Sequence, residues 1–289
     1  MGDAVQVLVN SLITGSIYLL AGTGLTLTYG LSRFPNFAFA EFLTFGAYIG
    51  YLTMQYPSGC LIVALGTAAL ATGLLSLAAY FTVFRPLINR HAALIPLMIA
   101  SIGLGYVIRY SLGECWSWSA LSYQQVWQTF TIGNTHITLL WLYLILAAAA
   151  TGTVLHLLFV LTKIGKAIRA TAANPELAQA SGINTERVTL FVWFVGGALA
   201  GVAGVFRAAD TQLYPMLGWD ILLPVFASVV LGGIGSFYGL LAAAAILGVA
   251  ENFGVVVLQA LGLSTEYRMA VAFLVLILVL IFRPRGLGR

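Results

Sequence analysis

Long apolar runs alternate with short polar stretches along this chain, and the pattern predicts its main elements. Most of the runs approach the ~20 residues that a helix needs to cross a bilayer. A barrel strand needs only about half that length, so the runs favour helices. The sequence predicts an all-α integral membrane protein, a polytopic bundle of about eight or nine transmembrane spans, with helices expected at residues 5–30, 36–56, 60–84, 92–112, 137–162, 188–208 and 267–282.

A glycine-rich stretch interrupts the apolar region 221–258. Gly232, Gly233 and Gly235 lie near its middle. The pattern indicates either two short crossings or one re-entrant pair with a broken helix. Broken helices occur at membrane depth where protein or a cavity covers the freed backbone groups. We therefore expect these three glycines to line a pathway through the bundle.

Positive charge is distributed unevenly among the loops. Cationic residues occur at Arg33, in the loop 85–91, in the segment 163–187 and in the tail 283–289, whereas the loop 113–136 has no lysine or arginine. The positive-inside rule then places the N-terminus outside and the basic segment in the cytoplasm. The loop without cations is polar and aromatic, as is typical of an outer interfacial loop. A cytoplasmic tail favours nine spans over eight.

The most polar segment of the chain contains a short helix with both ends marked. Asn174 is a suitable N-cap, Pro175 suits the first helical position, and Glu176 lies at the positive end of the helix dipole. Gly182 then marks the end. About two turns are too few to cross a membrane or to be stable alone in water. We expect this helix to pack against a partner protein in the cytoplasm.

Composition supports a membrane protein and excludes several other classes. The 289 residues are 61% hydrophobic and 8% charged, against about 25% charged residues in soluble domains. The net charge of +4 is spread among short loops and does not indicate a nucleic-acid partner. We expect residues 1–289 to form a single transmembrane domain. The N-terminus lacks a positive region, so it does not resemble a cleaved signal.

No motif in the chain indicates catalysis. It has no nucleotide-binding loop, no HExxH or CxxC pair and no GxSxG elbow. Asp3, Asp210 and Asp220 all lie at the ends of expected spans, which argues against an intramembrane hydrolase. We predict a protein that is not an enzyme and binds no metal or cofactor. Cys60 and Cys115 are expected on the outer side, either as a disulfide or as two unrelated apolar residues.

Several ionisable residues fall within or near the spans, where charge is costly and commonly functional. Glu41 follows Asn36 by five residues, and it has either a gating role or a structural hydrogen bond to a loop. We include both residues in the candidate translocation pathway. Arg207 and Asp210, three residues apart, form either a solvated interfacial pair or part of a substrate site. Two further candidates lie in the fourth span and in the interrupted region, Arg109 and Glu251.

The expected span 188–208 carries small residues at a spacing of four on one face. They are Gly196, Gly197, Ala200, Gly201 and Gly204. Such a face allows the backbone of a neighbouring helix to approach closely. Packing inside the bundle, a subunit interface and the wall of a pathway all remain open as explanations.

Four stretches together resemble one known family. They are GSIYLLAGTGLTLTYGLSRFPNFAFAEFLTFGAYIG near the start, GKAIRATAANPELAQASGINTERVTLFVWFVGGALAGVAGV, LGGIGSFYGLLAAAAILGVAENF and the terminal RPRGL. They are similar to the permease subunits of branched-chain amino acid ABC transporters, the LivH-like family. One departure is visible: the family commonly has Asn-Phe-Ala-His-Gly-Glu, whereas residues 36–41 here read Asn-Phe-Ala-Phe-Ala-Glu.

The resemblance implies the membrane subunit of an importer in the inner membrane of a prokaryote. The short helix, about residues 175–181, would be a coupling helix seated in a groove of an ATPase subunit. The coupling residues implied in this way are Arg169, Asn174, Pro175, Glu176, Leu177, Ala178, Gly182 and Arg187. Implied partners are a second related permease or a second copy, two ATPase subunits that carry ATP and Mg²⁺, an extracytoplasmic amino-acid-binding protein and membrane lipid.

The substrate implied by the resemblance is leucine, isoleucine or valine, or a related small zwitterion. A permease for urea, amides or other amino acids is the nearest alternative. The residues alone also leave open an ion-coupled secondary transporter with a broken helix, a passive channel and a structural scaffold. The absence of an energy-converting motif and the marked cytoplasmic helix favour a transporter that is driven by a separate protein.

Overall fold

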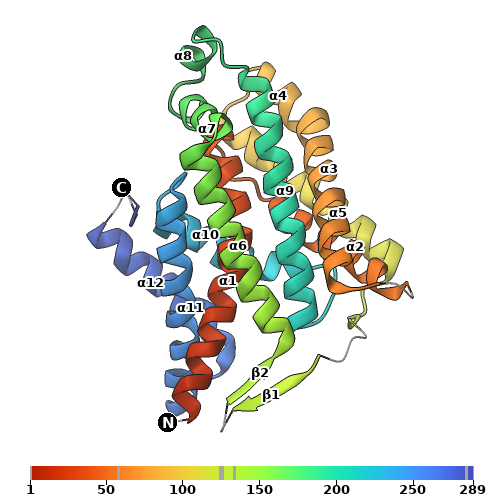
Figure 1. The fold of residues 1–289 in the computed structure, drawn as a ribbon, viewed down its shortest axis with the longest axis vertical. Coiled ribbons are helices and arrows are strands. Elements are labelled where there is room, and N and C mark those ends of the chain that lie inside the picture. Colours follow the sequence, from red (N-terminus) through yellow and green to blue (C-terminus); the bar gives the residue numbers. More distant parts are fainter. Residues whose placement is uncertain (1, 57–58, 124–126, 133–134, 284–285, 289) are drawn as a thin grey trace.

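A bundle of long helices makes up this protein, with a small hairpin at one end and two short helices at the other (Figure 1). The computed structural model describes residues 2–56, 59–123, 127–132, 135–283 and 286–288. In that part, six helical stretches are long and apolar enough to cross a membrane. Their bounds are Ala4–Ser32, Leu61–Asn89, Leu94–Trp116, Leu139–Leu161, Thr185–Asp210 and Phe237–Ala260.

These stretches correspond to α1 (Gly2–Ser32), α3 (Leu61–Ala79), α5 (Leu94–Trp116), α6 (Leu139–Leu161), α9 (Thr185–Asp210) and α11 (Phe237–Ala260). A π-helical turn, Tyr80–Phe84, and α4 (Arg85–Asn89) continue the α3 stretch. Three shorter helices complete the bundle: α2 (Phe39–Gln55), α10 (Leu217–Gly232) and α12 (Arg268–Phe282). The all-α membrane fold predicted from the apolar runs is therefore confirmed.

The two ends of the bundle differ in their connections. The N-terminus and the hairpin lie at one end, and α4, α7 (Lys163–Ala173) and α8 (Pro175–Ala180) lie at the other (Figure 1). The hairpin pairs β1 (Thr129–Ile132) with β2 (Thr135–Thr138) in antiparallel register, with Phe130 opposite Ile137. No strand was predicted in this loop. Its alternating threonines and apolar residues are nevertheless a pattern typical of strands.

Helix α9 lies at the centre of the bundle and packs on α1, α2 and α3. Its small residues allow these close approaches: a Cβ added at Gly196 would lie 3.0 Å from the Gly24 carbonyl oxygen of α1, and one at Gly201 would lie 2.7 Å from the Ala68 carbonyl oxygen of α3. Because lipid tails are as apolar as the side chains, such contacts rather than water exclusion hold membrane helices together. Of the three explanations for the small face, packing inside the bundle is the one observed.

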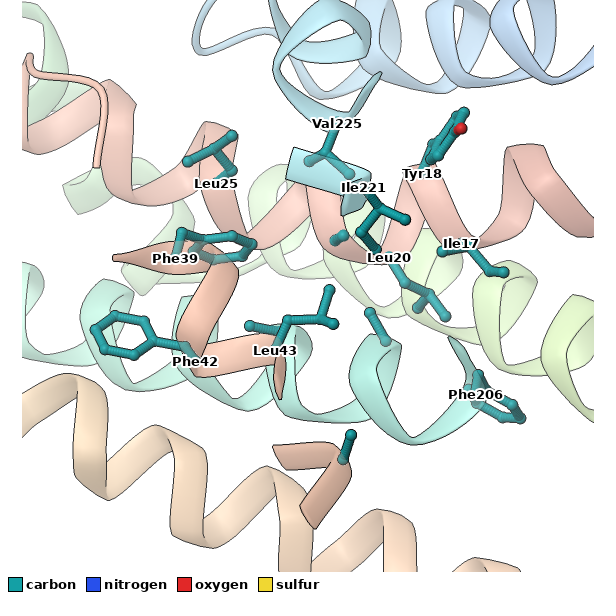
Figure 2. Packing of buried hydrophobic residues seen from close by; sticks show 14 of the residues in the cluster. Ile17, Tyr18, Leu20, Leu25, Phe39, Phe42, Leu43, Phe206, Ile221 and Val225 are labelled. Atoms are coloured by element: carbon teal, nitrogen blue, oxygen red, sulfur yellow. The ribbon is translucent and has the colours of Figure 1, made fainter. Parts of the chain in front are cut away.

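Large aromatic and aliphatic side chains fill the centre between these helices. Phe39, Phe42 and Leu43 of α2 meet Leu20 and Leu25 of α1 in one cluster (Figure 2). Trp193 of α9 is fully buried, and its indole Nε1 donates to Ser32 Oγ at 3.2 Å. Its carbonyl accepts from Ser76 Oγ at 2.9 Å. These polar groups of Trp193 are therefore paired inside the bundle, as an apolar environment requires.

Candidate functional site

The basic segment folds as two short helices that project from the bundle (Figure 1). The side chain of Thr162 caps α7 by accepting from Gly165 N at 3.0 Å. Asn174 Oδ1 accepts from Leu177 N at 3.0 Å and so caps α8, with Pro175 at its first position. Gly182, with φ of 83°, follows the last turn. The caps and the end of the predicted short helix are confirmed, although α8 ends one residue earlier, at Ala180.

Helix α7 was not predicted, although its sequence contains a signal. Thr162 is a suitable N-cap, and KIGKAIRATAA places Gly165, Ile168 and Thr171 at intervals of three residues, on one helical face. Ile168 is buried against the bundle, where it joins a small cluster with Leu155 of α6. The helix thus lies with one face on the protein and the other in solvent.

Most of α8 is exposed. Leu177, an apolar residue, is 64% exposed, and the side chains of Pro175 and Glu176 are exposed beside it. Ala178 is the exception at 4% exposed, since it faces its own chain. One apolar and one acidic side chain of α8, Leu177 and Glu176, are thus left uncovered by the rest of the chain. Of the predicted coupling residues, Glu176 and Leu177 are therefore available for contact, and Ala178 supports the loop itself.

Arginines attach this segment to the membrane helices. Arg33, just after α1, donates to the carbonyls of Ala172 and Ala173 at 3.2 and 3.3 Å, at the C-terminal end of α7. A cation is favourable at that end of a helix dipole. Arg169 donates to the Phe159 carbonyl of α6. Arg187 lies in the first turn of α9, where its backbone N donates to Asn184 Oδ1 at 3.0 Å. These bonds therefore tie α7 to α1 and α6.

A second group of predicted residues lies where α2 begins inside the bundle. Asn36 is 3% exposed; its Oδ1 accepts from Ala38 N at 3.1 Å, and its Nδ2 has no hydrogen-bond partner among the described residues. Phe37 N donates to Ser101 Oγ of α5 at 3.1 Å. These bonds satisfy backbone groups that the break between α1 and α2 leaves free. Irregular backbone at such depth is tolerated where protein covers it.

Glu41 is fully buried in the first turn of α2, and its partner is an arginine rather than a loop. Arg109 Nε of α5 donates to Glu41 Oε1 at 3.0 Å, and a second guanidinium nitrogen contacts the same oxygen. Glu41 Oε2 has no hydrogen-bond partner in the described part of the chain. The sequence identified both charges but did not pair them. Their pairing follows the rule that charges inside membrane helices find one another.

The same ion pair contacts the start of α10. The Arg109 guanidinium lies 4.7 Å from the ring centroid of Trp219, a cation–π contact. Gly218 N donates to Thr44 Oγ1 of α2 at 3.0 Å. The first turns of two short helices, α2 and α10, therefore meet inside the bundle beside one ion pair.

Near this junction, Tyr214 precedes α10 and donates to Asp220 Oδ2 at 2.6 Å. Burial and the Asp220 carboxylate together raise the pKa of the Tyr214 phenol to about 12. The phenol therefore stays protonated at physiological pH and remains a hydrogen-bond donor. Its hydrogen bond to Asp220 holds the loop before α10 against the first turn of that helix.

The predicted glycines form a turn between two helices. Helix α10 ends at Gly232 and α11 begins at Phe237, with Gly233 and Gly235 in left-handed conformation. Gly235 N donates to Thr26 Oγ1 of α1 at 3.2 Å. Of the region 221–258, α11 is long enough to cross a membrane, and α10, with 16 residues, is the short element. The turn borders a cavity of about 410 Å³ whose wall includes Arg169 of α7.

The end of the chain covers this glycine turn. Leu287 N donates to the Leu231 carbonyl at 2.9 Å, and Gly288 N donates to the Gly232 carbonyl at 3.0 Å. A Cβ at Gly286 would lie 2.6 Å from Gly233 N. No pattern in the sequence indicates that the tail returns to this turn. The turn is thus held between α1 on one side and the tail on the other.

Neither of the two remaining candidate pairs is formed. Arg207 and Asp210 form no ion pair with each other in the part of the chain that the structure describes. Asp210 instead accepts from Trp141 Nε1 at 2.7 Å. Cys60 and Cys115 are both free, so the disulfide alternative is not formed. No group of three or more metal-binding side chains occurs among the described residues.

Comparison with known proteins decides the family. A family model described as the permease component of a branched-chain amino acid transport system matches residues 7–280. The chain belongs to this family. It is therefore a transport component and not an enzyme, as the sequence predicted. The resemblance noted from the four sequence stretches is confirmed.

Relatives from archaea and bacteria agree with this assignment over nearly the whole chain. A probable branched-chain amino acid transport permease protein LivH of Methanocaldococcus jannaschii is 30% identical, over 98% of this chain and 91% of its own length. The high-affinity branched-chain amino acid transport system permease protein LivH of Escherichia coli K12 is 32% identical, over 98% and 95%. The ribose import permease protein RbsC of the same organism matches 42% of the chain at 33% identity.

A solved structure has a similar fold. PsaBC from Streptococcus pneumoniae in complex with Fab superposes with a TM-score of 0.50 over 96% of this chain and 91% of that chain. The sequence identity is 12%, so the similarity concerns the fold alone. The arrangement of helices in this permease therefore occurs in a chain of very different sequence.

Proposed function

We propose that this permease is the membrane-spanning subunit of an ATP-driven ABC importer. It translocates leucine, isoleucine, valine or related small zwitterions that an extracytoplasmic amino-acid-binding protein delivers. Two ATPase subunits supply ATP hydrolysis and hold ATP and Mg²⁺, and a second related permease or a second copy completes the membrane part. Family membership and the names of the relatives support the substrate class.

The observation that carries this proposal is the exposed, capped helix α8 at the end of the bundle. The chain has no ATP-binding loop of its own, and α8 offers Glu176 and Leu177 to a partner. Arg33 and Arg169 attach the neighbouring α7 to α1 and α6. Closure of the ATPase pair would move these helices as a rigid lever, and the bundle would alternate access between the two sides.

The proposed orientation in the inner membrane of a prokaryote places α7 and α8 in the cytoplasm and the N-terminus outside. The opposite positions of these two parts in the bundle support it (Figure 1). The described residues contain six long helices and the three short ones α2, α10 and α12, which fits the higher predicted count of nine spans. The short α10, whose first turn is buried against α2, would be one of the short crossings.

The Asn36 to Glu41 segment and the Gly232 to Gly235 turn are the proposed elements of the translocation pathway. Both join short or interrupted helices, and hydrogen bonds tie the first to α5 and the second to α1. Transporters commonly place such interruptions where the pathway must open and close. A permease for urea, amides or other amino acids keeps the same lever and differs in the pathway lining.

Uptake and ATP hydrolysis measured together test the lever. Glu176→Lys with Leu177→Ala changes two exposed side chains, so we expect the complex to assemble but the ratio of substrate transported to ATP hydrolysed to fall about tenfold or more, the effect of losing roughly 1.4 kcal/mol of coupling. Gln259→Lys, an exposed residue at the other end of the bundle, is the control. Normal coupling in the double variant contradicts the proposal, and uptake without any ATPase favours a secondary transporter or channel.

A further inference from the structure

A polar cavity of about 240 Å³ lies within this single chain, in the half of the bundle that holds the N-terminus. Its wall comes from α1, α6, α9, α10, α11 and α12. It is separate from the junction of α2, α5 and α10 and from the glycine turn. In the proposed orientation it lies on the outer side, where a binding protein would release its cargo.

Two opposite charges line this cavity without neutralising each other. Arg207 and Asp210 lie three residues apart on α9, a spacing that places both on one face. They form no ion pair within 4.0 Å in the described part of the chain. One carboxylate oxygen of Asp210 accepts from Trp141 Nε1. The helix therefore presents a separated cation and anion to the cavity.

One hydrogen-bond donor of the Arg207 guanidinium is also without a partner among the described residues. Its Nε is buried and has no hydrogen-bond partner among the described residues. Buried polar atoms are paired in the large majority of cases, and an orphaned one calls for an explanation such as a missing ligand. An arginine guanidinium is a fixed fork of donors that matches a carboxylate. The unpaired Nε donor of Arg207 and the cavity beside it therefore both indicate a ligand that carries a carboxylate.

The other charges of the region balance to zero. Tyr18 donates to the two oxygens of Glu251 at 2.9 and 2.8 Å, and Arg268 Nε lies 3.8 Å from Glu251 Oε2. Arg268 borders the cavity, and Glu251 lies behind Tyr18. Two arginines thus face two carboxylates, so a ligand with a net charge would unbalance the group. A ligand that carries both charges and is neutral overall would not.

Part of the wall is aliphatic, and it lies beside the polar side chains of Asn10, Thr14, Thr211 and Asn252. Ile13 and Ile17 of α1 and Ile221 of α10 border the cavity. Ile17, Tyr18 and Ile221 lie together at one end of the packed cluster (Figure 2). The volume is below the ~300 Å³ at which pockets for drug-sized ligands begin. The cavity therefore suits one small molecule with an apolar part rather than a peptide.

We propose that this cavity binds a small aliphatic α-amino acid as a zwitterion. The ligand's carboxylate accepts from Arg207, its ammonium group donates to Asp210, and its side chain lies against Ile13, Ile17 and Ile221. This site deepens the proposed function, and it rests on that function, because it assigns one transport subunit its own contact with the transported class. Binding here needs no second permease chain.

Direct binding tests the site. The complete transporter, purified into lipid nanodiscs without ATP and without the binding protein, is titrated with radiolabelled L-leucine in a scintillation proximity assay. We expect saturable binding that unlabelled leucine displaces. We expect 4-methylpentanoate and 3-methylbutylamine, which each carry one half of the amino-acid head group, to compete at least about tenfold more weakly, since a charged hydrogen bond contributes about 1.5–3 kcal/mol.

Variants assign the binding to this cavity. Arg207→Gln and Asp210→Asn each remove one charge and should weaken leucine binding about tenfold or more. Asparagine keeps the acceptor for Trp141, so the fold is preserved. Arg207→Lys keeps the charge but loses the fork of donors, so its leucine affinity should lie between those of the unmodified transporter and Arg207→Gln. Arg90→Gln makes the same substitution at an exposed arginine outside the cavity and should have no effect.

Two results would overturn this site. One is leucine binding that is as tight in Arg207→Gln and Asp210→Asn as in the unmodified transporter. The other is competition by 4-methylpentanoate or 3-methylbutylamine that is as strong as competition by unlabelled leucine. Failure of the proposed function looks different. Leucine binding that depends on Arg207, together with uptake that needs no ATP, keeps the site and overturns the ABC importer. If uptake is driven by ATP but leucine binding is unchanged by substitution of Arg207 and Asp210, the ABC importer function stands and the proposed binding site is wrong.

Discussion

The α7–α8 segment and the junction of α2, α5 and α10 hold polar groups in opposite ways. The segment satisfies its helix ends with neighbouring side chains, such as Asn174 three residues before Leu177, and leaves its charges in water. The junction buries Glu41 and Arg109, which are 68 positions apart, and each depends on the other. The comparison shows that local sequence can specify short capped helices at a bundle end, whereas an interior ion pair needs the assembled bundle.

The junction should be the more fragile region, and Glu41→Ala tests it most severely. The change leaves the Arg109 guanidinium buried without its carboxylate, so we expect a loss of about 3–5 kcal/mol of stability. Thermal unfolding in detergent measures it. The double variant Glu41→Gln, Arg109→Gln leaves no unpaired charge and should lose less than the sum of the two single variants. Additive losses would show that the two residues are not coupled.

The contact between the chain end and the glycine turn should contribute an intermediate amount to stability, less than the buried ion pair. Gly286→Ala places a methyl group near Gly233 N and adds the strain of a left-handed alanine, ~1–2 kcal/mol. Gly262→Ala is a matched control, since Gly262 has φ of 71° and open space around it. Stability and uptake should fall more for Gly286→Ala. Equal losses in the two variants would mean that the tail contact contributes nothing beyond backbone strain.

The lever should respond mildly to loss of its cap. Asn174→Ala removes the acceptor for Leu177 N and should cost about 1 kcal/mol in the stability of α8. Hydrogen exchange of the 174–181 amides should rise, while the thermal midpoint of the whole protein stays nearly unchanged. Asn174→Ser keeps an acceptor and should restore protection. Unfolding of the whole bundle by Asn174→Ala would show that the segment is not locally stabilised.

The smallest effect is expected from the exposed pair between Arg85 and Glu186. Their 2.5 Å contact joins side chains that are 40% and 52% exposed, so solvent screens it. Glu186→Ala should change stability by less than about 1 kcal/mol, and added salt should remove the difference. A loss as large as that of Glu41→Ala would contradict the distinction between the exposed ion pair and the buried one.

Sequence determined the features that depend on neighbouring residues. Apolar runs of helical length predicted the membrane helices, because each helix satisfies its own backbone in lipid. Asn174, Pro175 and Gly182 predicted the ends of α8, because caps act within a few residues. The positions of cationic residues predicted which loops share one end of the bundle. The fold class and the ends of α8 therefore follow from local sequence.

Tertiary structure alone decided which distant groups meet. The sequence identified Glu41, Arg109, Arg207, Asp210 and Glu251 as costly charges. It offered an Arg207–Asp210 ion pair as one alternative, which is not formed, and it left Glu41 and Arg109 apart. Glu251 meets Tyr18 across 233 positions, and the tail returns to Gly232. Such contacts depend on the order and rotation of whole helices, which apolar periodicity does not specify because most faces of these helices are apolar.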